Sequence, residues 1–459
     1  MSRWIALLLL IHLASAASAA SYVAQSETIP KGMTLEVGGI CFTQEGTLLV
    51  CTRWGEVWAK KGDQWKLFAS GLHEPLGIWA EHDEEVYVMQ RPELTRITAS
   101  QKDGVADTFE TVCDDWYMKG LETEYTYGLA RDKEGNFWSV LGPNWDNSPQ
   151  SAYRCWSFKV SPAGKIERWS CGLRNGDGIC VTPDGDTFVT DNQGEWTGAC
   201  SLHHVTKNAF HGCPWGIHSA EWLKDVPQTP QALDKFRKRP ALIFPYDHLA
   251  RSPTQPIVDT TGGKFGPFGG QIFVGDHTNP MIIRIALEKV DGEFQGACFP
   301  FLTAGLNRGN HRLAFSPDGS LFIGQTVRGW LGQGNEGLQQ IKYNGTTPFD
   351  VHDIALTANG FDLNFTLPVD EKIAVAPQQF TIRRFRYNYW NQYGSPEIDN
   401  APVAVAKAEC SDDRKRISLT VAELKKEFIY EFTFRGLQSA DGSTLSNNKA
   451  WYTLNNLQH

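Results

Sequence analysis

The chain has 459 residues, of which 41% are hydrophobic and 12% aromatic, and its formal net charge at pH 7 is -9. This apolar content excludes a disordered chain, and the negative charge argues against a nucleic-acid partner. The ten cysteines include no C-x-x-C pair, which excludes c-type haem attachment and the common zinc ribbons.

The first 20 residues predict a secretory signal peptide. Arg3 gives a positively charged start, Trp4 to Leu13 form an apolar core, and Ala17-Ser18-Ala19 matches an A-x-A cleavage site. The apolar run is shorter than the about 20 residues that a membrane-spanning helix needs, and no later run is long enough. We therefore expect a secreted or periplasmic protein without a membrane span. A short uncleaved anchor is the alternative.

A short turn between two β-rich runs recurs along residues 21–350 and predicts a repeat architecture. Pro183-Asp184-Gly185 and Ser316-Pro317-Asp318-Gly319 are two of six such turns, several of them spaced by about 50 residues. A Gly-Leu pair opens three of the copies, at 71, 172 and 305. The predicted fold class is all-β, with a six-bladed β-propeller over 21–350 followed by a small β-sandwich.

The spacing of the repeats is broken near 220–256, and the fifth unit is expected from Pro267 onward. Thr229-Pro230 predicts a helix N-cap followed by proline at the first helical position, so we expect a helical insertion there. From 354 to 459 apolar and polar residues alternate, as in Phe361, Leu363 and Phe365. This pattern predicts an immunoglobulin-like sandwich, a module that binds, spaces or docks to another protein.

Cysteine and histidine residues leave two questions open. Cys41 and Cys51 flank one turn and either form a disulfide or remain buried thiols. A cluster of metal-capable side chains follows the central repeat, but adjacent strand residues point to opposite faces. Structural histidines are therefore the favoured interpretation and a metal site the alternative. The cluster comprises His203, His204, His211, Cys213 and His218.

The order of the motifs resembles the glucose/sorbosone dehydrogenase family of soluble quinoproteins. The resemblance covers about Gly39 to Tyr343. It implies a six-bladed propeller whose funnel binds pyrroloquinoline quinone and Ca²⁺ and oxidises a sugar hydroxyl or aldehyde by hydride transfer. It is carried by Gly172-Leu173-Arg174-Asn175, Thr190-Asp191-Asn192-Gln193-Gly194, Ser252-Pro253-Thr254, Gly270-Gln271-Ile272-Phe273-Val274-Gly275-Asp276 and Arg312-Leu313-Ala314-Phe315-Ser316-Pro317-Asp318-Gly319.

The resemblance implies roles for individual residues. Arg174 and Asn175 match catalytic positions, and Asp191 and Asp276 are the implied Ca²⁺ ligands. The family's histidine base is expected just before Gly128, where this chain has no histidine, so Glu124 or Tyr125 would have to replace it. Because the quinone is a tricarboxylate, its pocket needs cations. The candidate cofactor-binding residues are Arg53, Arg91, Asn192, His277, His311, Arg312 and Arg328.

Two functions from different classes remain at this point. The first is an exported sugar dehydrogenase of the aldose or sorbosone type that acts on a sugar or a polysaccharide fragment. The second is a propeller that binds carbohydrate or protein without catalysis. The absence of the expected histidine separates them, because either a carboxylate has replaced the base or the chemistry is lost.

Overall fold

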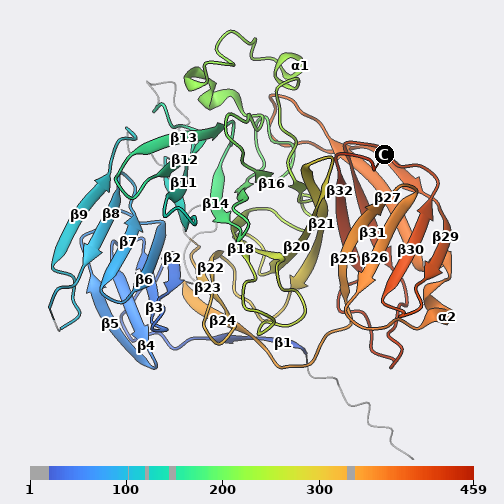
Figure 1. Cartoon of the computed structure of the whole chain (residues 1–459), viewed down its shortest axis with the longest axis horizontal. Helices are drawn as coiled ribbons and strands as arrows, with labels where there is room; N and C mark the ends of the chain where they lie inside the picture. Colours follow the sequence, from blue (N-terminus) through green and yellow to red (C-terminus); the bar gives the residue numbers. More distant parts are fainter. Residues whose placement is uncertain (1–19, 102, 119–123, 144–150, 328–335, 459) are drawn as a thin grey trace, which may run out of the picture.

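The computed structural model describes residues 20–101, 103–118, 124–143, 151–327 and 336–458. Its strands form six blades around one axis, with a β-sandwich beside them (Figure 1). The predicted class, a six-bladed β-propeller followed by a small β-sandwich, is confirmed.

Each of the first four blades is an antiparallel sheet of four strands in sequence order. Blade one is β2 (Val37–Phe42), β3 (Leu48–Thr52), β4 (Val57–Lys61) and β5 (Gln64–Ala69). Blade two is β6 (Gly77–His82), β7 (Glu85–Met89), β8 (Leu94–Thr98) and β9 (Thr108–Cys113). Blade three is β10 (Thr126–Arg131), β11 (Phe137–Leu141), β12 (Trp156–Val160) and β13 (Ile166–Cys171). Blade four is β14 (Gly176–Val181), β15 (Thr187–Asp191), β16 (Ser201–His204) and β17 (Leu242–Ile243).

The last two blades close the ring and connect it to the sandwich. Blade six takes its outermost strand from the start of the described chain, because β1 pairs with β24 in the register Tyr22 to Tyr343. The two ends of the propeller are therefore hydrogen-bonded in one sheet. Blade five is β18 (Pro253–Val258), β19 (Ile272–Asp276), β20 (Ile282–Val290) and β21 (Glu293–Leu302), and blade six is β22 (Asn310–Phe315), β23 (Leu321–Gln325), β24 (Gly337–Tyr343) and β1 (Tyr22–Ser26).

The recurring turns join the two innermost strands of their blades. In blade four, Thr182 N donates to Asp186 O at 2.8 Å, and Gly185 has a φ of 91°. Blade six repeats this arrangement with Gly319 at a φ of 92°. Glycine occupies this position because side chains disfavour a positive φ.

Apolar side chains fill the spaces between neighbouring blades. Between blades one and two, for example, Leu49 and Phe68 pack in one buried cluster with Ile78 and Val88. Comparable clusters lie between the other neighbours. The second strands of blades one, three, four, five and six (β3, β11, β15, β19 and β23) are therefore fully buried between neighbouring blades, which explains the abundance of β-branched and aromatic residues.

The innermost strands approach each other so closely that two positions leave no room for a side chain. A Cβ atom on Gly38 would lie 1.9 Å from the carbonyl oxygen of Pro75 in the next blade. A Cβ atom on Gly178 would lie 2.3 Å from the Cα of Gln255. These glycines set the diameter of the central channel.

The segment predicted as a helical insertion is mostly irregular. It contains α1 (Pro230–Leu233), with the Thr229 side chain accepting from Ala232 N, and it follows the 3₁₀ turn η1 (Pro214–Ser219). Strand β17 and the start of β18 lie within 220–256, so the excursion belongs inside blade four, between β16 and β17. Blade five begins at Pro253, earlier than the expected Pro267, because the proline-containing β18 does not show a continuous apolar run.

The sandwich after the propeller has sheet orders β25-β26-β30-β29 and β32-β31-β27-β28. Phe361, Leu363 and Phe365 are buried on alternate positions of β26, as predicted. The assignment of this sandwich to the immunoglobulin-like type stays a prediction. The elements are β25 (Val351–Thr357), β26 (Gly360–Phe365), α2 (Glu371–Ala374), η2 (Pro377–Gln379), β27 (Phe380–Tyr387), β28 (Glu397–Val403), β29 (Val405–Cys410), β30 (Arg416–Val421), β31 (Phe428–Phe434) and β32 (Lys449–Leu454).

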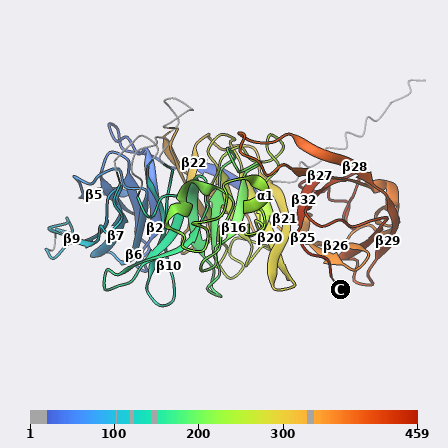
Figure 2. The ribbon, with the colours of Figure 1, turned by 90° about the horizontal axis from the view of Figure 1, so that it is seen from above.

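The sandwich continues the sheet of blade five. Strand β32 pairs with β21 in the register Ala297 to Tyr452, which makes one sheet of eight strands. Phe299 of blade five is buried in the same apolar cluster as Phe361 of the sandwich. Figure 2 shows the sandwich lying beside the rim of the propeller. The expectation of a separate module is therefore corrected: the two parts share a sheet and a core.

All ten cysteines are free thiols, so the Cys41–Cys51 disulfide does not form in this structure. Burial raises the pKa of the Cys41 thiol to about 12. The two residues are not opposite each other in the hairpin, where Cys41 pairs with Leu49 and Cys51 with Gly39. The alternative of two free thiols holds, with Cys51 buried and Cys41 half-buried.

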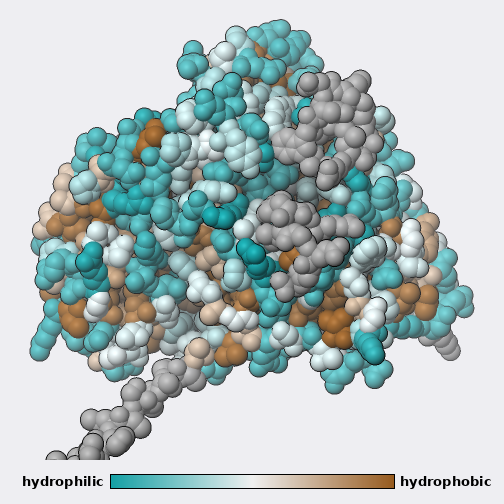
Figure 3. Space-filling model, turned by 180° about the vertical axis from the view of Figure 1, so that it is seen from behind, coloured by the Kyte–Doolittle hydropathy of each residue, from teal (hydrophilic) through white to brown (hydrophobic). Residues whose placement is uncertain are grey.

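The surface of the described chain is mostly polar. Figure 3 shows one face on which hydrophilic side chains predominate over both propeller and sandwich. Among the described residues, no helix combines the length and the apolar character that crossing a bilayer requires. The predicted signal peptide lies outside the described residues except for Ala20.

Replacing Gly38 by alanine tests the close approach of the innermost strands. The new methyl group would collide with backbone rather than with a flexible side chain, so we expect Gly38→Ala to lower the free energy of unfolding by about 1–3 kcal/mol. Gly269→Ala is the control, because a Cβ atom there meets nothing within 4 Å. Urea denaturation of both variants measures the difference, and equal stability would contradict the packing described.

Candidate active site

The central channel brings together two side chains that are 134 residues apart in the sequence. Asp177 in β14 and His311 in β22 each lie at an irregularity in the register of the innermost strand. A β-bulge of this kind adds a residue and redirects its side chain. The result is a pair across the channel, with His311 Nε2 3.3 Å from Asp177 Oδ1.

The surroundings of this pair lower the pKa of both groups. His311 Nδ1 lies 3.1 Å from Val37 O, so both ring nitrogens face acceptors and only the doubly protonated ring can donate to both. Burial and then Arg312 lower the pKa of His311. Burial alone would raise the pKa of Asp177, but His311 and Arg312 together bring it below its ordinary value. These shifts favour an ionised Asp177 beside a neutral His311, so each group has a site open to a proton, and Arg312 lowers the proton affinity of both.

His277, at the end of β19, extends this group. Its ring centroid lies 6.2 Å from that of His311, in an edge-to-face arrangement. Burial, followed by the nearby His311, lowers the pKa of His277 to about 4. His277 is therefore neutral at pH 7. The structure thus brings together the predicted residues His277 and His311 and adds Asp177 to them.

Arg312 has a different role from the one expected. Its Nε donates to Gly38 O at 2.9 Å, Nη1 to Asp177 O at 3.0 Å, and Nη2 to Leu76 O at 3.2 Å. The side chain joins four blades, because Nη1 also donates to His311 O, and it is only 1% exposed. The prediction that it binds a quinone is corrected, because all three nitrogens donate to backbone carbonyl groups.

A second group, at the mouth of the channel, has two arginines and one carboxylate. Glu74 accepts from Arg53 at 3.4 Å and from Arg91 at 2.8 Å. Both guanidinium groups lie over the ring of Tyr125, at 4.8 and 4.2 Å from its centroid. Burial opposes ionisation of Glu74, but the two arginines lower its pKa.

Glu124, the predicted substitute base, adjoins this second group but is 1% exposed. Its backbone carbonyl accepts from Arg91 Nε at 2.9 Å. The neighbouring Tyr125 is half-buried and is therefore more accessible than Glu124. Arg328, another predicted cofactor ligand, lies outside the described residues.

A third group forms the wall of the mouth in blade four. The Asp191 carboxylate accepts from Asn175 N at 2.6 Å and from Arg174 N at 2.9 Å. Burial raises the pKa of Asp191 to about 6 despite these donors. Asn192 is 6% exposed, and its Oδ1 has no hydrogen-bond partner among the described residues. Arg174 Nη2 lies 3.1 Å from Glu195 Oε2.

The two aspartates expected to bind Ca²⁺ serve as caps at strand ends. Asp276 Oδ2 accepts from the backbone N–H groups of Arg251 and Ser252, and its Oδ1 accepts from those of Thr278 and Asn279. Asp191 uses its oxygens in the same way. Within the described ranges, no group of three or more His, Cys, Asp or Glu side chains could hold a metal ion. The metal assignment is therefore corrected.

His203, His211 and Cys213 of the blade-four cluster are buried, whereas His204 is half-buried and His218 is exposed. The rings of His203 and His211 are 4.7 Å apart, and His211 Nε2 lies 3.1 Å from Ser170 Oγ. Burial lowers the pKa of His203 to about 3. His204 Nε2 lies 3.1 Å from Asp186 Oδ1. His203 and His211 are therefore structural, as the favoured interpretation held.

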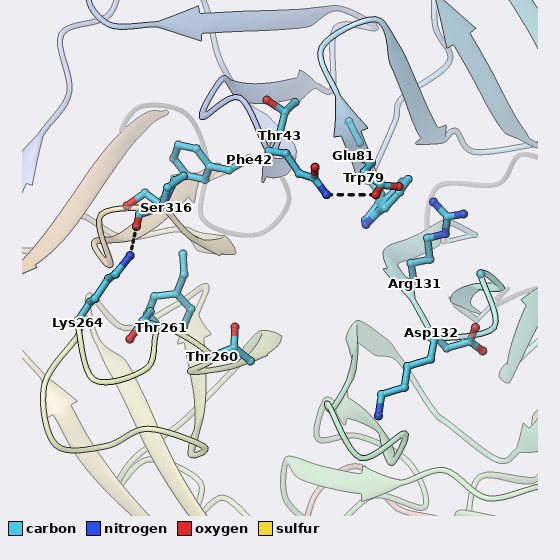
Figure 4. Close-up of a pocket in the computed structure, with 16 residues that line it drawn as sticks. Phe42, Thr43, Trp79, Glu81, Arg131, Asp132, Thr260, Thr261, Lys264 and Ser316 are labelled. Atoms are coloured by element: carbon cyan, nitrogen blue, oxygen red, sulfur yellow. Dashed lines mark hydrogen bonds between the residues drawn. The ribbon is translucent and has the colours of Figure 1, made fainter.

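A cavity of about 690 Å³ opens at the opposite end of the channel (Figure 4). It lies among the hairpin turns, with Trp79 and Arg131 on one side and Thr261 and Lys264 on the other. The Arg131 guanidinium stacks on Trp79 at 4.0 Å. None of the predicted site residues lines this cavity. The candidate site is at the other mouth, where the innermost strands begin.

Asp177 is a channel residue to which the sequence motifs did not point. It stands between two glycines in Gly176-Asp177-Gly178, in the turn-rich stretch before a strand. Its counterpart position in blade six is His311, also at a bulge. Aligning the pseudo-repeats on their first strands would have placed both residues on the channel.

The fold and this site define a six-bladed propeller with a polar group in its channel. No protein-family model and no curated protein matches the chain. Several solved structures share this propeller fold. The chain is similar to a Thermus thermophilus protein described as an oxidoreductase (glucose dehydrogenase), with 14% identity, a TM-score of 0.53, and coverage of 70% of this chain and 99% of the other.

Two aldose sugar dehydrogenases show the same likeness. One is the form of the Streptomyces coelicolor enzyme with bound pyrroloquinoline quinone, at 15% identity and a TM-score of 0.50, covering 71% of this chain and 99% of that one. The other is the apo form of the soluble enzyme of Escherichia coli, at 14% identity and a TM-score of 0.51, covering 70% and 100%. The resemblance seen in the motifs is thus confirmed for the fold.

Removing the Arg312 side chain should destabilise the propeller. Arg312→Met would leave the carbonyl groups of four blades without their donor, and we expect a loss of at least about 3 kcal/mol in the free energy of unfolding. Arg96→Met is the matched control, since this arginine is 40% exposed and an exposed pair contributes about 1 kcal/mol or less. Chemical denaturation compares the two, and an unchanged Arg312→Met stability would refute the structural role.

The low pKa of His277 predicts a pH dependence of stability. Between its ordinary value of 6.5 and about 4, the unfolded chain binds a proton that the folded chain does not, so stability falls as the pH falls through this window. His277→Gln should lose about 2–3 kcal/mol less than the wild type between pH 7 and pH 4.5. Urea midpoints at both pH values measure this, and parallel losses would contradict it.

Proposed function

We propose that this chain is a sugar oxidoreductase whose propeller funnel binds pyrroloquinoline quinone and oxidises a sugar by hydride transfer to it. The main support for the proposal is the Asp177–His311 pair, a proton acceptor placed beside the arginine-rich mouth. The propeller fold of the aldose sugar dehydrogenases supports it as well.

Three side chains at the mouth of the channel suit an anionic planar ligand. Arg53 and Arg91 share one carboxylate, and Arg53 Nε has no hydrogen-bond acceptor among the described residues. Asn192 adds a buried amide on the blade-four side. These three residues would hold the carboxylates and carbonyls of the quinone. A Ca²⁺ ion does not fit Asp191 and Asp276, so no step depends on it.

The residues of the chain would handle the proton of the reaction. Oxidation of a sugar hydroxyl removes a hydride from carbon and a proton from oxygen; the bound quinone would supply the hydride acceptor. The proton goes to Asp177, whose side chain is 14% exposed in the channel. His311 positions that carboxylate and shares the proton. This pair would take the role of the family's histidine base, for which Glu124 or Tyr125 was the expected replacement.

Export and docking are also proposals. The composition of residues 1–20 supports secretion or transfer to the periplasm. Docking of a protein to the sandwich would use strands other than β32, because β32 is already paired with β21.

Two variants test the proposed chemistry. We expect the purified protein to bind pyrroloquinoline quinone, seen as a shift in its absorbance, and to reduce a dye with one or more of a panel of aldoses. Asp177→Asn should lower kcat by about a hundredfold or more with unchanged quinone affinity. Asp184→Asn, in the exposed turn between β14 and β15, is the control and should keep full activity.

The outcomes separate the two classes of function. Absence of quinone binding in the wild type would refute the quinoprotein assignment. Full turnover by Asp177→Asn would refute the role of the pair. Sugar binding without turnover in the wild type would favour the non-catalytic carbohydrate-binding propeller.

A further inference from the structure

A loop of the sandwich reaches back onto the mouth of the propeller. Residues 388–396, between β27 and β28, are fixed to blade four by backbone hydrogen bonds. Trp196 N donates to Trp390 O at 3.0 Å, and Gly394 N donates to Gly194 O at 3.0 Å. The Tyr389 hydroxyl donates to Gly212 O at 2.6 Å. The sandwich therefore forms part of the wall of the mouth.

The anchoring of this loop includes a close approach of Gly394 to the Gln193 side chain. Gly394 has a φ of 61°, and a Cβ atom there would lie 2.9 Å from the Gln193 side chain. The loop belongs to a sheet that continues through β32 into blade five. Its position is thus set at two places, by the shared sheet and by the contacts with blade four.

This fixed loop holds an aromatic side chain in solvent. Tyr393 is 65% exposed, although its backbone pairs with Glu195 in an isolated bridge. The Arg174 guanidinium lies 5.3 Å from the centroid of the Tyr393 ring and 5.9 Å from that of Trp215. The ion pair with Glu195 holds the guanidinium in place. An exposed ring that is immobilised in this way loses little entropy when a ligand stacks on it.

The distance to the channel indicates the length of the ligand. Arg174 lies three residues before Asp177, in the bend that leads into β14, so the two residues can lie up to about 10 Å apart. A ligand that spans such a separation, from Asp177 to the Tyr393 ring beside Arg174, has to contain two or three linked sugar rings.

We propose that Tyr393, with Arg174 and Trp215, forms a subsite that stacks a sugar unit beyond the one that is oxidised. The C–H groups on the face of a pyranose ring complement the negative face of an aromatic ring, while Arg174 and Glu195 meet its hydroxyl groups. The substrate is accordingly an oligosaccharide rather than a single sugar. This inference rests on the proposed function for the position of the oxidised unit.

Binding of an oligosaccharide ladder tests the subsite. Cello- and malto-oligosaccharides of one to six units are titrated into the full-length protein by calorimetry, with and without pyrroloquinoline quinone. We expect affinity to rise from one unit to three in at least one series, and Tyr393→Ala to remove this rise, about a tenfold loss for the longer ligands. Tyr393→Phe should keep it, because the ring does the stacking.

Phe109→Ala is the matched control, an exposed aromatic on the outermost strand of blade two that is 48% exposed. It should leave the affinities for oligosaccharides of every length unchanged. Affinity independent of chain length in the wild type, or equal affinity of the wild type and Tyr393→Ala, would overturn the subsite. If oligosaccharide affinity rises with chain length and depends on Tyr393, but no quinone binds, the subsite is supported and the oxidoreductase function is refuted.

Discussion

The propeller depends on one guanidinium group at its centre. Arg312 donates to carbonyl oxygens contributed by blades one, two, four and six, at a point where the innermost strands leave backbone groups facing the channel. An unpaired buried carbonyl costs free energy, so the side chain satisfies several at once. The glycines of the innermost strands allow the close approach that brings those carbonyls within its reach.

This central guanidinium also shapes the chemistry of the channel. Because Arg312 lies in the channel and carries a positive charge, it stabilises the Asp177 carboxylate and disfavours the His311 imidazolium. The same residue that holds the ring together thus adjusts the proton affinity of the pair beside it. The structural and electrostatic roles of Arg312 are coupled, since the bulge that turns His311 into the channel immediately precedes Arg312.

The sandwich adds to the site from outside the circle of blades. The shared sheet and the contacts with blade four hold the Tyr393 side chain beside the Arg174 guanidinium.

Local structure could be predicted from the sequence: the hairpin turns, the alternating strands of the sandwich and the number of blades. Turn chemistry and strand periodicity are properties of short stretches of sequence. The turn at Gly185 and the inward-facing position of Phe361 could therefore be predicted without knowing the tertiary structure. The resemblance of the motifs pointed to Arg53, Arg91, His277 and His311, which lie in two groups around the channel and whose roles stay predictions. It gave Asp191 and Asp276 the wrong partners, because a carboxylate that caps backbone N–H groups and one that binds a metal look alike in sequence.

The meeting of distant residues, in contrast, became visible only in three dimensions. Asp177 and His311 pair because both blades place a bulge at the same height around the axis, and no local pattern records that coincidence. The pairing of β32 with β21 was equally invisible, since a strand edge carries no sequence mark of the sheet that it will join. Contacts between residues far apart in the chain depend on how whole sheets are arranged, and that arrangement follows from the packing of all the blades together.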